Sequence, residues 1–489
     1  MSQKKGEYSD IAKATRIFGG SQIVILISNI LRTKFVAIFL GASGYGILAL
    51  YQSTIALIST FSNLGLGTMA IKEIAGANNS KDQARINKTI HVVRRLSWYT
   101  GIFGAFITLF FSIPLSILIF DTPDFYIGFC WLSLAILLNQ LTTSNVAILR
   151  GLRKNKKIAN ASVTGAIIGL FISVPLYYYF GKNAIVPALI ISSFISFLRS
   201  WVFAKDIKVE KKHLENISIW KYGKPMITGG IILSITTLIT IIKDLIIRLY
   251  IEQKGGLIDV GLYHSALLII NSYLGIIFTI MSMDYFPNLS SKINNEKESK
   301  SILNKQLIFG LTIIIPLISF FLVFNRLIIE VLLSNRFTNI EYLLSVAVLG
   351  TVFKLYSWSH SYIILSKGDN KRFFWSEFIA VMVSFVLSIG GYSVYGLNGL
   401  GYGYTVGFIY YAIQTQLLCT YWYNINIKKG TLLIFLIGVI IILFTHLSTY
   451  HLNNITLKIV SLLISFIFGL LLLKKMQISF DLKGLWKRK

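Results

Sequence analysis

Residues 17–70 read IFGGSQIVILISNILRTKFVAIFLGASGYGILALYQSTIALISTFSNLGLGTMA, and they contain two apolar segments joined by a short glycine-rich run. Each segment has at least the roughly 20 residues that a helix needs to cross a hydrocarbon core about 30 Å thick. The same alternation of apolar segments and short polar joins continues along the chain. We therefore predict an all-α polytopic membrane protein with about 14 transmembrane helices. The predicted spans are residues 17–40, 44–70, 89–118, 125–147, 158–180, 184–204, 222–251, 258–286, 306–328, 341–366, 373–395, 400–424, 431–449 and 455–474.

The basic residues of the joins fall almost entirely in every second join, counted from the N-terminus. The alternate joins hold only Lys182, Lys254 and Arg336. Because cytoplasmic loops carry the excess of Lys and Arg, this pattern predicts that both termini lie in the cytoplasm. The net charge of +27 therefore reflects topology. A chain that is 54% hydrophobic, with a mean hydropathy of +0.67, does not have the composition of a soluble nucleic-acid-binding protein.

The polar joins are too short to hold a folded soluble domain, since the longest, 71–88 and 287–305, have the length of loops. No G-x-x-x-x-G-K-S/T sequence is present, which argues against ATP as an internal energy source. Residues 1–16 are charged and precede an apolar run too long for a cleavable signal core, so we expect an uncleaved anchor. We predict no catalytic residue, no metal and no cofactor, and a location in the bacterial inner membrane.

Two parts of the chain resemble each other. A Gly-Gly pair ending at Gly20 begins the first span, and a second pair ending at Gly230 stands near the start of the seventh span. Arg32 follows the first pair and Lys243 the second at nearly the same spacing, and a glycine-rich join comes next in both copies. The second copy begins six predicted spans after the first. Because six is an even number, the copies have the same orientation in the membrane, as in parallel-repeat transporters.

The repeat predicts how the chain is organised. We expect a six-helix lobe at 1–204, a basic cytoplasmic linker at 205–221 and a second six-helix lobe at 222–424. Residues 425–489 would add two helices and a basic cytoplasmic tail. In transporters built from such repeats, the substrate site lies at the repeat interface near the bilayer midplane.

Four basic side chains are predicted to lie deep within the spans: Arg32, Lys34, Lys243 and Lys354. A charge at the bilayer centre costs about 2.5–3.5 kcal/mol, so such a residue usually faces a cavity or a partner. Acidic residues within the spans are scarcer, which predicts a net cationic interior that attracts an anion. Arg binds phosphate as a two-pronged donor and Lys binds it as a point charge. We therefore predict that these four residues bind an anionic substrate, with a phosphate or diphosphate as the expected group.

Asp244, Glu377, His264 and His360 also lie within the predicted spans. They are candidates for coupling transport to an H⁺ or Na⁺ gradient, and the membrane potential is a further energy source. For the two histidines, a hydrogen-bonded packing role is the competing interpretation. Asp244 precedes Arg248 by four residues, a same-face spacing that permits an ion pair within one helix.

Several local sequences then carry a resemblance to a known family. They are Leu40-Gly-Ala-Ser-Gly-Tyr-Gly-Ile-Leu-Ala-Leu50, Leu149-Arg-Gly-Leu-Arg-Lys154, Val260-Gly-Leu-Tyr-His-Ser-Ala266 and Met283-Asp-Tyr-Phe-Pro-Asn-Leu-Ser290. These sequences resemble the polysaccharide flippases, the Wzx-type O-antigen translocases of the multidrug/oligosaccharidyl-lipid/polysaccharide exporter superfamily. The resemblance covers residues 10–425 and depends more on the order of the motifs than on any single one.

The resemblance implies two six-helix lobes in a V shape that alternate between inward-open and outward-open states. It implies a cargo, an oligosaccharide unit on undecaprenyl diphosphate, that moves from the inner to the outer leaflet before polymerisation. The family uses cationic lumen residues for this cargo, and the matching positions here are Arg32, Lys243 and Lys354. Membrane lipids, a polysaccharide polymerase and a chain-length regulator are the implied partners.

Other functions remain open at this point. The two added helices also resemble those of the 14-helix peptidoglycan-precursor flippases, and a teichoic-acid precursor is a further anionic cargo. A multidrug exporter of the same superfamily would need acidic groups in its lumen. A surface-glycan polymerase or ligase would show a long outer loop with candidate catalytic residues, whereas the outer joins here are short.

Overall fold

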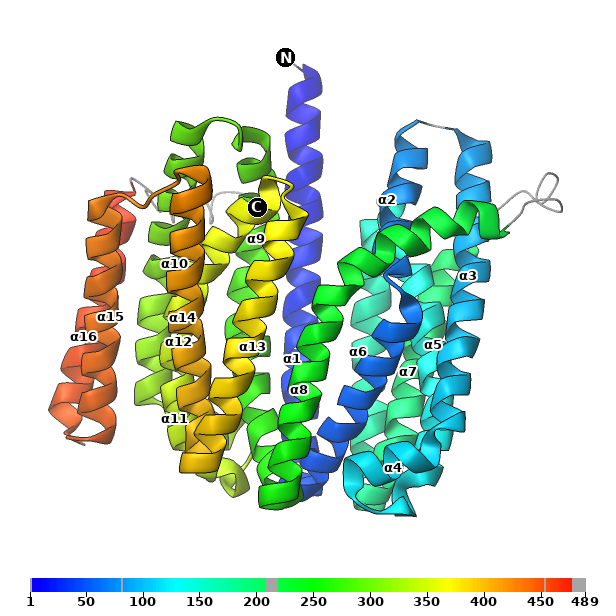
Figure 1. Ribbon diagram of the computed structural model, residues 1–489, viewed down its shortest axis with the longest axis horizontal. Coiled ribbons are helices and arrows are strands. Elements are labelled where there is room, and N and C mark those ends of the chain that lie inside the picture. The colour runs from blue at the N-terminus through cyan, green and yellow to red at the C-terminus, as the bar shows by residue number, and fades with distance from the viewer. Residues whose placement is uncertain (1, 81, 208–218, 453, 477–489) are drawn as a thin grey trace. The chain divides into compact units, whose positions relative to one another are not determined.

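The computed structural model describes residues 2–80, 82–207, 219–452 and 454–476, and all of its regular elements are helical (Figure 1). The elements in chain order are α1 (Ser2–Asn63), α2 (Leu66–Asn79), α3 (Gln83–Phe110), α4 (Ser112–Phe120), η1 (Pro123–Phe125), α5 (Tyr126–Gly151), α6 (Asn155–Phe180), η2 (Gly181–Ala184), α7 (Ile185–Lys205), α8 (Ile219–Leu268), η3 (Ile269–Leu274), α9 (Gly275–Lys292), α10 (Glu296–Val323), α11 (Asn325–Leu332), η4 (Asn335–Ile340), α12 (Glu341–Ser366), α13 (Asn370–Tyr395), α14 (Leu397–Tyr423), α15 (Lys429–Tyr450) and α16 (Ile455–Lys475).

Nine helical stretches in the described part of the chain are long and apolar enough to cross a membrane, or ten if the bent pair α3–α4 is one span. Three of the nine, Val24–Asn63, Asn155–Lys205 and Ser234–Lys292, each overlap two predicted spans. The helix α14 contains one more predicted span, although its glycines and tyrosines make it less apolar than the nine. The prediction of an all-α polytopic membrane protein is therefore confirmed.

The longest helices, α1 and α8, are each interrupted by one glycine. Gly41 has φ 63° and ψ −174°, and Gly256 has φ 72° and ψ −176°. A side chain strongly disfavours this region of backbone conformation, so glycine is the residue that fits both breaks. Each break lies in the glycine-rich join that the sequence places between two spans.

The contacts divide the chain into two units. The N-terminal unit continues to Gly261 and includes Leu332–Ser334, and the C-terminal unit contains Leu262–Val331 and the residues from Asn335 onward. Within the N-terminal unit, α1 packs on α3 and α6, and α5 packs on α3 and α7. Within the C-terminal unit, α14 packs against α12 and α13. The lobes at 1–204 and 222–424 stay a prediction, and most of the predicted linker (208–218) lies outside the described residues.

The two added helices belong to the C-terminal unit. The helices α15 and α16 pack against each other, and both pack against α10 (Figure 1). At Gly469 of α16, an added Cβ would lie 2.9 Å from Pro316 of α10, so this glycine permits the close approach of the two helices. Of the predicted basic tail, residues 477–489 lie outside the described part of the chain.

Candidate functional site

Arg32 faces a cavity inside the N-terminal unit. The cavity has a volume of about 300 Å³ and is lined by residues of α1, α5, α6 and α7. The guanidinium Nη2 of Arg32 donates a hydrogen bond to Ser192 Oγ of α7 at 3.0 Å. The other polar residues that line the cavity are Asn29, Thr142, Ser162, Ser196 and Ser200.

The partners of Arg32 in this cavity are neutral. The residues lining the cavity, all in the described part of the chain, include no Asp or Glu. A hydroxyl or an amide satisfies part of the hydrogen-bonding capacity of a guanidinium but does not cancel its charge. The cavity therefore offers a positive charge and several hydrogen-bonding groups, a combination that suits an oxyanion.

Small residues of α6 keep this cavity open. Gly165 and Gly169 line one wall, and an added Cβ at either position would meet no atom within 4 Å. The helix has Ala161 and Ala166 on the same wall. Because these four residues have at most a methyl group, the space in front of Arg32 remains unfilled.

Lys34 lies two residues after Arg32 on α1 and is half-buried. It is not among the residues that line the cavity of Arg32. Positions two apart on a helix point in different directions, which accounts for this separation.

Lys243 of α8 has a carboxylate beside it. Its Nζ lies 2.9 Å from Asp244 Oδ1, and the two side chains are 16% and 33% exposed. Arg248 makes a different contact, since its Nη1 donates a hydrogen bond to the backbone carbonyl of Asp244 at 3.2 Å. The four-residue spacing of Asp244 and Arg248 thus leads to a side-chain-to-backbone bond, while the Asp244 carboxylate pairs with its sequence neighbour.

Lys354 is half-buried in the C-terminal unit, at the middle of α12. Its Nζ donates hydrogen bonds to Asn271 Oδ1 at 3.1 Å and to the Tyr404 hydroxyl at 3.5 Å. The ammonium also lies 5.6 Å and 5.5 Å from the ring centroids of Phe278 and Phe408, within cation–π distance. Asn271 belongs to the π-helical turn η3, a feature that often occurs at functional sites.

Glu377 of α13 is held by two hydroxyl groups. Ser361 Oγ donates a hydrogen bond to Glu377 Oε1 at 2.8 Å, and the Tyr411 hydroxyl donates a short hydrogen bond to the same oxygen. The three residues come from α12, α13 and α14. Such a carboxylate is a candidate for binding and releasing a proton or a cation.

The two predicted histidines both lie in the C-terminal unit. His360 is fully buried, its Nδ1 lies 2.8 Å from the Tyr356 carbonyl oxygen, and its ring stacks on that of Tyr356 at 4.6 Å. His264 is half-buried in α8. No group of three or more His, Cys, Asp or Glu within the described residues is arranged to hold a metal ion.

The structure thus brings together only parts of the predicted site. Arg32, Lys34, Lys243 and Asp244 lie in the N-terminal unit, and Lys354, Glu377, His264 and His360 lie in the C-terminal unit. Sequence reasoning missed the neutral partners Ser192, Asn271 and Tyr404. Ser192 is 160 residues from Arg32 along the chain, so only the tertiary fold reveals the pair.

Comparison with solved structures places the fold among polytopic transporters. The chain is similar to an inward-facing multidrug-resistance MATE family transporter of the MOP superfamily, with a TM-score of 0.66, 15% identity, and coverage of 81% of this chain and 93% of that one. It is also similar to the lipid II flippase MurJ in an inward closed conformation, with a TM-score of 0.65, 16% identity, and coverage of 95% and 98%. These likenesses define the class of fold.

Sequence comparison defines the family. The family model described as polysaccharide biosynthesis protein matches residues 35–342, and the chain belongs to this family. A Shigella flexneri protein named O-antigen transporter is 27% identical over 336 residues, which cover 65% of this chain and 76% of that protein. The lipid III flippase of Escherichia coli K12 is 22% identical over 421 residues, which cover 82% and 96%. The predicted membership in a polysaccharide flippase family is confirmed.

Proposed function

We propose that this protein is a flippase of the bacterial inner membrane, with both termini in the cytoplasm. It moves an oligosaccharide linked to undecaprenyl diphosphate, an O-antigen unit or a similar surface-polysaccharide unit, from the inner to the outer leaflet. The movement occurs by alternating access between lobes at 1–204 and 222–424, without ATP hydrolysis. The names of the relatives and the family membership support this class of cargo.

The observation that carries the proposal is the cavity of Arg32. A guanidinium within a membrane span is costly unless it faces polar groups or a ligand. Here it faces about 300 Å³ of space, neutral hydroxyl groups and no acidic lining residue. This arrangement favours a cargo with a phosphate group. It disfavours a multidrug exporter of organic cations, which would need a carboxylate there.

Lys354 is the proposed second contact. Asn271 and Tyr404 are neutral hydrogen-bond partners of its ammonium, and the rings of Phe278 and Phe408 lie within cation–π distance of it. We assign Arg32 to two-pronged binding of a phosphate and Lys354 to a point-charge contact. We assign Lys243 a structural role, because Asp244 offsets its charge. A role of Lys34 in cargo binding stays a prediction.

The membrane potential is the proposed main energy source. Movement of one negative charge outward across an inside-negative potential is favoured by about 2.3 kcal/mol per 100 mV. Glu377, held by Ser361 and Tyr411, is the favoured residue for additional H⁺ or Na⁺ coupling. Asp244, His264 and His360 stay alternative coupling residues.

The proposal is tested in a strain from which the gene has been deleted and then restored as variants. The double variant Arg32→Ala/Lys354→Ala should abolish surface polysaccharide, and lipid-linked units should accumulate on the inner leaflet. The control is Arg326→Ala, which removes a largely exposed arginine paired with Glu330 and should leave surface polysaccharide unchanged. Immunoblots of membranes check that each variant is present. Normal surface polysaccharide in the double variant would refute the proposed site.

The main alternative is another anionic lipid-linked cargo, a teichoic-acid or peptidoglycan precursor. The same variants distinguish the two kinds of cargo, because the lipid-linked unit that accumulates can be extracted and identified from its sugars. A polymerase and a chain-length regulator of the same pathway are proposed partners. Co-purification of either with the full-length protein from detergent-solubilised membranes tests this.

A further inference from the structure

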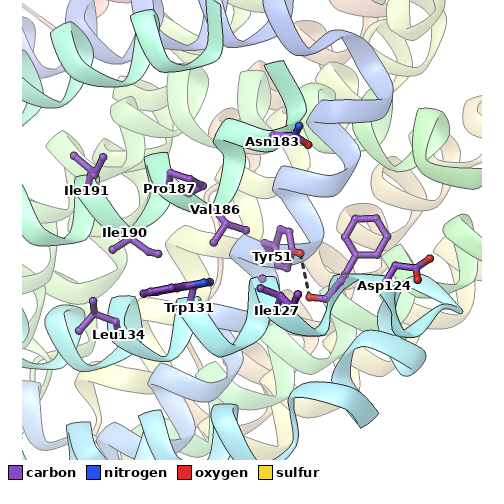
Figure 2. Close-up of a pocket in the computed structure, with 12 residues that line it drawn as sticks. Tyr51, Asp124, Ile127, Trp131, Leu134, Asn183, Val186, Pro187, Ile190 and Ile191 are labelled. Atoms are coloured by element: carbon purple, nitrogen blue, oxygen red, sulfur yellow. Dashed lines mark hydrogen bonds between the residues drawn. The ribbon is translucent and has the colours of Figure 1, made fainter. Parts of the chain in front are cut away.

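The N-terminal unit has a second cavity, which the proposed transport of the cargo does not use. Its volume is about 550 Å³, within the range of about 300–1,000 Å³ that is usual for small-molecule sites. It is lined by Tyr51 of α1 and by residues at the starts of α5 and α7 (Figure 2). We call it the α5–α7 groove.

The two ends of the α5–α7 groove differ in polarity. Figure 2 shows Ile190, Ile191 and Leu134 towards one end, Asp124 towards the other and Tyr51 between them. Asn183 of η2 is a further polar lining residue. The groove is therefore apolar along the helices and polar at the turns that connect them.

Tyr51 lies at the middle of the groove and packs within a cluster of aromatic side chains (Figure 2). The Tyr51 ring makes edge-on contacts with Phe120 and Phe129 at 5.2 Å and 5.0 Å, and its hydroxyl donates to the Phe125 carbonyl at 3.5 Å. Gly128 permits this placement, since an added Cβ there would lie 2.3 Å from the Tyr51 hydroxyl oxygen. The Tyr51 hydroxyl therefore already has a backbone partner beside the groove.

The side chains around the α5–α7 groove indicate what kind of molecule would fit in it. The α5 side chains beside the groove are apolar and exposed, with Ile127 53% and Trp131 60% accessible. On a membrane-spanning helix, such side chains face hydrocarbon. A molecule that enters from hydrocarbon, with an apolar chain and a polar end at the membrane surface, is a bilayer lipid.

The charge at the polar end selects the headgroup. Asp124 is exposed in η1, and its carboxylate repels an anionic headgroup but attracts an ammonium. We propose that the α5–α7 groove binds one phosphatidylethanolamine molecule, with an acyl chain along Trp131 and Ile190 and the ammonium at Asp124.

Trp131 serves as the reporter in the test. The full-length protein is placed in nanodiscs that contain phosphatidylethanolamine or phosphatidylglycerol with brominated chains, which quench nearby tryptophan fluorescence. The difference between wild-type and Trp131→Phe protein isolates the signal of Trp131 from those of the other tryptophans. We expect half-maximal quenching at about threefold lower mole fraction of phosphatidylethanolamine, the size of effect that one exposed charge pair produces.

Two variants test the headgroup contact. Asp124→Asn should remove the preference while leaving the maximal quenching unchanged. Asp121→Asn is the matched control, because it removes another exposed acidic residue from a nearby turn that does not line the groove. Asp121 has a left-handed backbone conformation, which Asn also adopts. This variant should leave the preference for phosphatidylethanolamine intact. Equal quenching by both lipids in the wild type would mean ordinary lipid contact and would overturn the proposal. A preference for phosphatidylglycerol, or a preference that survives in Asp124→Asn, would overturn it as well.

Discussion

The helices α1 and α8 have similar backbones but present their deep basic residues in different ways. Both are interrupted by a glycine, Gly41 or Gly256, with nearly identical dihedral angles. Arg32 precedes the first break and Lys243 the second. Arg32 faces a cavity with neutral partners, whereas Lys243 is paired with Asp244 at 2.9 Å.

This difference shows that a basic residue in a span cannot be assigned a role from its depth alone. What decides whether an anion is attracted is the net local charge, which is the charge of the basic side chain together with that of any neighbouring carboxylate. The positive charge of Arg32 remains uncompensated by its cavity, and that of Lys243 is largely offset. The two helices are thus similar in backbone and different in chemistry.

The variant Ser192→Asp would make the surroundings of Arg32 like those of Lys243. A carboxylate at this position would pair with the guanidinium and neutralise the cavity. We expect surface polysaccharide to be lost, as in the double variant Arg32→Ala/Lys354→Ala, measured in the gene-deleted strain with membrane immunoblots. Ser192→Asn, which is similar in size but uncharged, should retain most of it. Full polysaccharide production by Ser192→Asp would show that a free charge at Arg32 is not needed.

Substitution of the two break glycines tests whether the backbones are equivalent. Gly41→Ala and Gly256→Ala should each lower the free energy of unfolding by about 1–3 kcal/mol, because alanine is strained at these dihedral angles. Thermal unfolding of the purified variants measures both effects. Gly430→Ala is the control, since Gly430 has no positive φ and open space where the Cβ would lie. A large loss at one break and none at the other would contradict the equivalence.

The variant Asp244→Asn tests the pairing in α8. It leaves the half-buried ammonium of Lys243 without its carboxylate, and we expect a loss of about 1 kcal/mol in stability, modest because both side chains keep some exposure. The double variant Lys243→Met/Asp244→Asn should recover that loss, because it removes both charges. Thermal unfolding of the single and double variants measures the coupling. Additive effects of the two substitutions would show that no such pair exists.

The smallest expected effect is that of Ser192→Ala. It removes one neutral hydrogen-bond partner of Arg32 but leaves its charge, so we expect cargo binding to weaken by about two- to tenfold. Binding of undecaprenyl diphosphate to the purified protein measures this change. A loss of binding as large as that of Ser192→Asp in the same binding assay would mean that orientation, rather than charge, is the decisive property of Arg32.

The sequence predicts most of the fold because each span must satisfy its own backbone hydrogen bonds as a helix. The glycines of the joins also mark the breaks at Gly41 and Gly256. The depth of Arg32 and Lys354 is predicted by counting residues, because the helical rise is constant.

The partners of the charged residues could not be predicted in the same way. Spacing along a helix indicates Arg248 as the partner of Asp244, but the long side chain of Lys243 reaches the adjacent carboxylate. Ser192 and Asn271 are brought to Arg32 and Lys354 by tertiary packing and by the π-helical turn η3. Neither effect leaves a periodic pattern in the sequence.

The most direct test compares undecaprenyl diphosphate binding by purified Arg32→Ala and Lys243→Ala proteins in the same detergent. If Arg32 supplies the positive charge that binds the diphosphate, Arg32→Ala should raise the Kd about tenfold or more, as expected for the loss of charge-assisted hydrogen bonds. The Kd of Lys243→Ala should stay within about twofold of that of the wild type. Equal losses of affinity in both variants, or a larger loss in Lys243→Ala, would contradict the account.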